Sequence, residues 1–155
     1  MAGFVTNRGK ARELNSFYRN QNTPGGFYLA LVTAAASPSV DTNLWSDLSA
    51  SEIAAGNGYT AGGQAISRTT TDWDVLTEDD TADRALVQLK NIVWTASGGP
   101  IPASGAGARY AVLMDDNATP ANREVLIVWD LGADRTVSSG QTLTLIDSER
   151  RSNNA

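Results

Sequence analysis

Short apolar runs, each followed by residues typical of turns, occupy the second half of the sequence and constrain its fold more than any other feature. These runs cover residues 85–94, 109–114, 124–131 and 142–146. Glycine, proline, asparagine and aspartate are concentrated between them, as in "TASGGPIPASGAGA" and "DDNATPANR". No helix-length periodic segment lies between the runs. The pattern therefore favours an antiparallel sandwich or barrel over alternating strand–helix units.

The individual runs differ in what they predict. Residues 85–94 indicate one long strand with a bulge near Asn91, where the apolar alternation slips. Residues 124–131 are apolar on both faces, which predicts a central strand covered from both sides. In residues 142–146 the alternation is clean, with Leu143 and Leu145 facing inward. The last residues, 148–155, are polar and charged, and we predict a flexible tail there.

The first half contains one strong strand, at residues 27–33, and one short helix, at residues 6–19. Thr6 or Asn7 is suited to cap the helix, and Leu14, Phe17 and Tyr18 fall on one of its faces. The helical segment holds four basic residues against one acidic residue, a net charge of +3. Either this is a solvated helix face, or it is an arm that docks on an acidic partner surface. The four basic residues are our candidate interface residues: Arg8, Lys10, Arg12 and Arg19.

Residues 41–83 form an acidic segment, with nine Asp or Glu against one Arg. Spaced apolar and aromatic anchors run through it, so we expect an ordered but strand-poor excursion. Within it lies "GNGYTAGGQAISR", which is rich in glycine but lacks both G-x-G-x-x-G and the GK[ST] ending of a phosphate loop. We interpret this stretch as a structural corner in which glycines adopt positive φ and Tyr59 folds back onto the sheet.

Composition narrows the possible functions. The 155 residues suit a single domain, and 41% of them are hydrophobic, enough for a substantial core. The net charge of −5 disfavours binding to nucleic-acid phosphates. No apolar run approaches the length of roughly 20 residues that spans a bilayer. The charged N-terminal residues do not resemble a secretory signal, so we expect synthesis in the cytoplasm.

The chain has no cysteine and no histidine. This composition excludes disulfides, thiolate nucleophiles and histidine-based catalytic triads, and it removes the commonest transition-metal ligands. Carboxylate chemistry remains open. Asp79, Asp80 and Asp83 do not have the spacing of an EF-hand loop, and Asp130 is the acid we expect to be semi-buried, in a hydrogen-bonded structural role. We predict no enzymatic activity, no cofactor and no metal.

The order of several segments resembles a group of small structural proteins from the virions of tailed bacteriophages. The resemblance covers most of the chain: "TNRGKARELNSF", "FYLALVTAA" with "SPSVDTN", "LSASEIAAGNGYTAGGQAI", "IVWTASGGPIPASGAGARYAVLMDD" and "VLIVWDLGADRTVSSGQTLTL". Its most specific elements are "GNGYTAGGQAIS" and "WDLGADRTVSSGQTLTL". The resemblance implies a role in the particle, as a head decoration (cement) protein or a tail-associated component, with no catalytic residues.

We therefore predict a mainly β, antiparallel sandwich or jelly-roll-like domain at residues 23–147. An N-terminal helix or arm at residues 1–22 precedes it, and the flexible tail at 148–155 follows. The expected function is to bind and stabilise the capsid on its outer surface, as a dimer or trimer, with the major capsid protein as partner. A tail or tail-fibre adaptor is the first alternative. A carbohydrate-binding or glycosidase-like module is the second, and it requires exposed tryptophans among Trp45, Trp73, Trp94 and Trp129.

Overall fold

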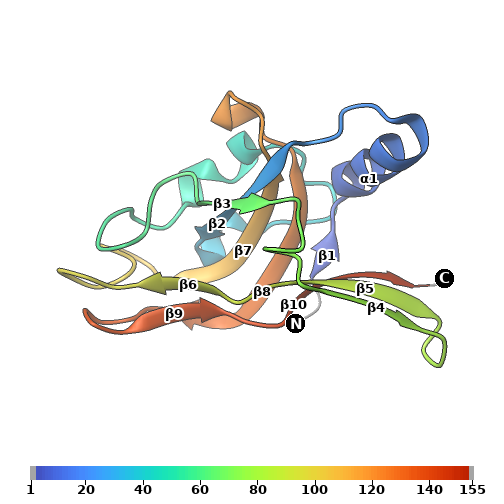
Figure 1. The fold of residues 1–155 in the computed structure, drawn as a ribbon. Helices are drawn as coiled ribbons and strands as arrows, with labels where there is room; N and C mark the ends of the chain where they lie inside the picture. Colours follow the sequence, from blue (N-terminus) through green and yellow to red (C-terminus); the bar gives the residue numbers. More distant parts are fainter. Residues whose placement is uncertain (1–2, 154–155) are drawn as a thin grey trace.

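The computed structural model describes residues 3–153 and consists of two layers of antiparallel strands with one short α-helix (Figure 1). The helix, α1, spans Asn7–Arg19. The ten strands are β1 (Phe4–Val5), β2 (Gly26–Val32), β3 (Gln64–Ser67), β4 (Val75–Asp79), β5 (Arg84–Leu89), β6 (Ile92–Thr95), β7 (Ala108–Asp115), β8 (Val125–Arg135), β9 (Thr142–Leu145) and β10 (Ser148–Asn153). Four single-turn 3₁₀ helices lie in the loops: Ala34–Ala36, Trp45–Asp47, Ser49–Ser51 and Pro120–Asn122.

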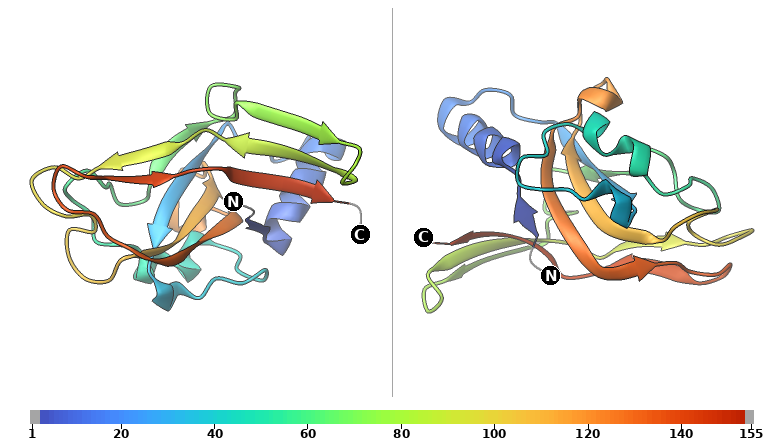
Figure 2. Two further views of the ribbon diagram at one scale, coloured as in Figure 1. Left: turned by 90° about the horizontal axis from the view of Figure 1, so that it is seen from below. Right: turned by 180° about the vertical axis from the view of Figure 1, so that it is seen from behind.

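The first layer is a five-stranded sheet in the order β1-β8-β7-β2-β3. The second layer combines a two-stranded part, β6-β9, with a three-stranded part, β10-β5-β4. These parts are continuous along the chain, because β5 leads into β6 and β9 leads into β10. Figures 1 and 2 show the second layer crossing beneath the five-stranded sheet and extending past it on the side of α1. The predicted antiparallel β-sandwich-like domain with a short N-terminal helix is confirmed.

The main core lies between the two layers. Trp129 and Leu113 of the five-stranded sheet pack in one cluster with Leu89, Ile92 and Leu145 of the second layer. A second cluster covers the opposite face of the five-stranded sheet, where Trp45 and Leu48 come from the segment that precedes β3. Both faces of β7 and of the first half of β8, Val125–Trp129, are therefore largely buried, which explains why these residues of β8 are apolar without alternation.

The glycine-rich corner is built as predicted. Tyr59 is 2% exposed, and its hydroxyl accepts the backbone N–H of Leu31 at 3.0 Å and donates to Glu52 Oε1 at 2.7 Å. Burial raises the pKa of the Tyr59 hydroxyl, so this group stays a neutral donor. Gly58 has a φ of +110°, and a Cβ there would lie 2.1 Å from the carbonyl oxygen of Thr95. The stretch is thus a tight crossing of two backbones with a tyrosine anchor.

Two predictions about the second layer are wrong. Residues 85–94 do not form one strand, because β5 ends at Leu89 and β6 begins at Ile92. The Lys90 N–H between them donates to the carbonyl of Asp72 at 2.8 Å. The flexible tail predicted for 148–155 is also incorrect within the described residues. Ser148–Asn153 form β10, an edge strand that pairs with β5 from Ser148↔Leu89 to Asn153↔Arg84.

Candidate interaction surface

The helix α1 begins at a cap that ties it to the five-stranded sheet. Thr6 is fully buried, and its hydroxyl accepts the N–H of Gly9 at 2.9 Å and donates to the Val125 carbonyl at 2.5 Å. The helix ends at Asn20, which adopts the left-handed conformation with a φ of 50°. Thr6 is therefore both the predicted N-cap and a link to β8.

The side of α1 that faces the sheet is small and polar. Gly9 is buried against Leu126 of β8, and a Cβ at Gly9 would lie 2.3 Å from the Leu126 carbonyl oxygen. Only glycine allows this approach, so the helix backbone lies directly on the strand. This packing buries no large apolar side chain of α1.

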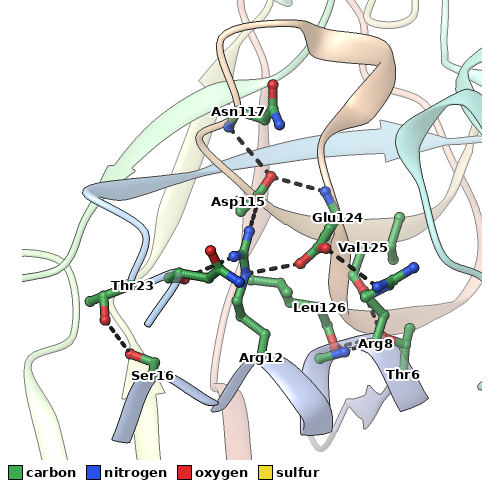
Figure 3. A network of polar contacts seen from close by, with 12 residues as sticks. Thr6, Arg8, Arg12, Ser16, Thr23, Asp115, Asn117, Glu124, Val125 and Leu126 are labelled. Atoms are coloured by element: carbon green, nitrogen blue, oxygen red, sulfur yellow. Dashed lines mark hydrogen bonds and ion pairs between the residues drawn. The ribbon is translucent and has the colours of Figure 1, made fainter. Parts of the chain in front are cut away.

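Arg12 fastens the same side of α1 to the sheet with ionic contacts (Figure 3). Its guanidinium pairs with Asp115, at the end of β7, and its Nε lies 2.9 Å from Glu124 Oε2. It also donates from Nη1 to the Asn22 carbonyl at 2.8 Å. Arg8 lies 3.6 Å from the same Glu124 carboxylate. Two of the four predicted interface residues, Arg8 and Arg12, therefore form ion pairs within the chain.

The other two predicted interface residues, Lys10 and Arg19, are exposed on α1. Neither forms an ion pair or side-chain hydrogen bond with any residue in the described part of the chain. These two cations are thus available for an external partner.

The apolar face of α1 points into solvent. Leu14 is 58% exposed, Phe17 is 82% exposed and Tyr18 is 76% exposed. The rings of Phe17 and Tyr18 contact each other edge to face, with centroids 4.9 Å apart. An amphipathic helix normally turns such a face toward the core. We call Lys10, Leu14, Phe17 and Tyr18 the outer face of α1; Arg19 lies on the side of the helix that carries Arg8 and Arg12. The apolar side chains of the outer face are grouped on one short helix, unlike the scattered exposed residues that need no explanation.

A second exposed surface of opposite charge lies on β4, an edge strand of the second layer, and the turn after it. Leu76 is 80% exposed and Val75 is 39% exposed. Glu78, Asp80 and Asp83 are exposed and form no ion pair among the described residues, whereas Asp79 pairs with Arg84 at 3.0 Å. We call Val75, Leu76, Glu78, Asp80 and Asp83 the acidic hairpin. The sequence indicated its charge but not its exposed apolar residues.

Asp79 and Asp130, two of the acids considered for other chemistry, have structural partners. Asp79 is occupied by Arg84, and within residues 3–153 no group of three or more acidic side chains is placed to hold a metal ion. Asp130 is exposed, not semi-buried as expected, and it accepts two hydrogen bonds from Arg109, at 2.8 and 3.1 Å. Arg109 and the Gly132 N–H lower the pKa of Asp130, which is the opposite of what a general acid requires.

The tryptophans do not form an open binding face. Trp45, Trp94 and Trp129 are buried, and Trp73 is half-buried against Phe27, with ring centroids 5.9 Å apart. The structure therefore lacks the exposed tryptophans on which the carbohydrate-binding interpretation depends. No α-helix within residues 3–153 is long and apolar enough to cross a bilayer.

Comparison with protein-family models and with curated proteins gives no significant match to the chain. The resemblance to virion structural proteins of tailed phages therefore stays a prediction from the segments quoted above.

Proposed function

We propose that the protein is a non-catalytic structural component of a tailed-phage virion, and that it binds the outer surface of the capsid as a decoration protein. The resemblance of its segment order to this class supports the proposal. The physical support is that the β-sandwich holds the exposed apolar side chains of α1 in a fixed position. Its expected partner on the particle is the major capsid protein.

The observation that carries the proposal is the outward orientation of the apolar side chains of α1. Leu14, Phe17 and Tyr18 remain in water at a free-energy cost, since each would gain from burial. Meanwhile Thr6 and Arg12 hold the helix in one position on the sandwich. An apolar surface that is held rigidly, with cations beside it, loses little conformational entropy on binding and so suits stable attachment.

The proposal is tested by adding the purified protein to emptied, expanded phage heads that lack it. We expect saturable binding, a copy number that scales with the number of capsomers, and greater resistance of the heads to chelation or heat. Isolated tails from the same phage serve as the matched control. Binding to tails alone would favour the tail-adaptor alternative, and binding to neither would contradict a virion role.

A further inference from the structure

The outer face of α1 and the acidic hairpin lie at the same end of the molecule. Figure 1 and both views of Figure 2 show α1 beside the part of the second layer that extends past the five-stranded sheet, with the β4–β5 turn at its tip. Glu13 of α1 and Arg150 of β10 join the helix to the second layer, with Arg150 Nη2 2.7 Å from Glu13 Oε2. The two surfaces nevertheless do not cover each other, since Phe17 and Leu76 are 82% and 80% exposed.

The two surfaces are complementary in charge. The outer face of α1 carries the unpaired cation Lys10, and the acidic hairpin carries the unpaired anions Glu78, Asp80 and Asp83. Because neither set of charges is paired within the chain, a contact between the helix and the hairpin is favoured over helix–helix and hairpin–hairpin contacts, which would bring like charges together.

Both surfaces also carry exposed apolar groups beside their charges. Leu14 and Phe17 lie on the same helix face as Lys10, as Leu76 and Val75 lie beside the hairpin acids. Lys10 and Phe17 are seven residues apart, which is about 10 Å along a helix. Leu76 and Asp80 are four residues apart, about 14 Å along a strand. The two spacings differ by about 4 Å, which the flexible Lys10 side chain spans, so a helix laid on β4 places apolar groups together while Lys10 reaches the acids.

We propose that two copies of this chain form a twofold dimer in which the outer face of α1 of each copy packs on the acidic hairpin of the other. Because both surfaces lie at one end of each molecule, a single twofold axis makes the contact twice and closes the assembly. The second copy also covers β4, an unpaired strand edge that would otherwise be open to association. The dimer covers the outer face of α1, so this face cannot contact the capsid at the same time, and a dimer on the particle would attach through another surface. The test of the dimer uses the purified protein alone and does not depend on the virion role.

The test uses two charge-reversed proteins, which we call the helix variant (Lys10→Glu) and the hairpin variant (Glu78→Lys with Asp80→Lys). All three side chains are exposed, so the thermal midpoint of each variant should match that of the wild type at a protein concentration where the wild type is monomeric. In sedimentation velocity over a concentration series, the wild type should dimerise. Each variant alone should dimerise at least about tenfold more weakly, because like charges then face each other in both contacts.

Mixing the two variants identifies the contact. In a mixed dimer both helix–hairpin contacts again join opposite charges, so an equimolar mixture should recover dimers with nearly wild-type affinity. Asp134→Lys, which reverses an exposed acid at the far end of β8, should leave wild-type dimerisation unchanged. Phe17→Ala should weaken the dimer by about tenfold or more without changing the fold. A wild type that stays monomeric, or a mixture in which dimers are not restored, would overturn the proposal.

Discussion

Arg150 of β10 and Glu13 of α1 form a bidentate ion pair between residues 137 positions apart in the chain, with hydrogen bonds of 2.8 and 2.7 Å. The pair is the ionic link between the helix and the second layer, whereas Arg12 links the helix to the five-stranded sheet. Its glutamate raises the pKa of Arg150 above the ordinary value. The position of α1 is therefore set by both layers of the sandwich.

We predict that Arg150→Ala loosens α1 with little loss of global stability. Side-chain exposures of 20% for Arg150 and 45% for Glu13 limit the expected loss to about 1 kcal/mol or less, and salt should mask it. Hydrogen exchange should show faster exchange in α1. Arg151→Ala is the matched control, since Arg151 pairs with Glu149 of its own strand. Equal exchange in α1 for both variants would contradict the role given to Arg150.

Arg12→Ala should cost more, because it leaves the carboxylate of Asp115, only 3% exposed, without its cation. The backbone N–H groups of Glu124 and Asn117 still donate to Asp115, at 2.9 and 3.4 Å. We therefore expect a loss of about 2 kcal/mol, below the full penalty for an orphaned buried charge.

Urea unfolding measures the effect of Arg12→Ala, with the exposed Lys10→Ala as the control that should change stability by less than about 0.5 kcal/mol. Adding Asp115→Asn to Arg12→Ala should recover part of the loss, since the asparagine carries no charge that needs a partner. Similar losses for Arg12→Ala and Lys10→Ala would show that the Asp115 pair contributes nothing.

The strands of the core could be predicted from the sequence because their signals are local. Apolar alternation and flanking turns are properties of short segments, so residues 27–33 and 142–146 were assigned close to β2 and β9. Tyr59 was placed as an anchor because glycines on both sides left it as the only large side chain of the corner.

The remaining features depend on tertiary contacts that no local pattern encodes. The segment Ser148–Asn153 has no apolar alternation, and it becomes a strand because β5 offers it a free edge. Periodicity identified one face of α1, yet it could not say that Gly9 would turn the opposite face toward β8. For the same reason the sequence could not separate Arg8 and Arg12, which pair within the chain, from Lys10 and Arg19, which do not.

Acid should weaken the contact between Asp72 and Lys90, which joins the segment before β4 to the end of β5. Burial alone would raise the pKa of Asp72, but hydrogen bonds from Lys90 and from the Ser67 N–H outweigh it and hold the pKa below the ordinary value of 3.8. A carboxylate with a lowered folded-state pKa contributes stability above its unfolded pKa, and that contribution is lost as the pH falls through the folded pKa.

The stability of the wild type should thus decline below about pH 4, and Asp72→Asn should remove part of that decline. The measurement is the urea midpoint at a series of pH values. Asp74→Asn, an exposed neighbour with no ion pair among the described residues, should leave the decline unchanged. If Asp72→Asn and the wild type lose stability in parallel on acidification, protonation of Asp72 does not contribute to the loss of stability.

Gly9→Ala gives the sharpest test of how α1 lies on the sheet, because helix propensity and packing predict opposite results. In an exposed helix, replacing glycine with alanine stabilises by about 1 kcal/mol. Here the added Cβ would lie 2.3 Å from the backbone oxygen of Leu126, which cannot move without disturbing β8. We expect a net loss of about 1–3 kcal/mol.

The control for Gly9→Ala is Ala11→Gly, two residues further along the exposed side of the helix. It should lose about 1 kcal/mol through propensity alone, with the contact to β8 intact. Hydrogen exchange distinguishes the two variants, because only Gly9→Ala should increase the exchange rate of the Leu126 amide in β8. A higher melting temperature for Gly9→Ala would mean that the helix does not rest on the Leu126 carbonyl, and the outward direction of Leu14, Phe17 and Tyr18 would no longer follow.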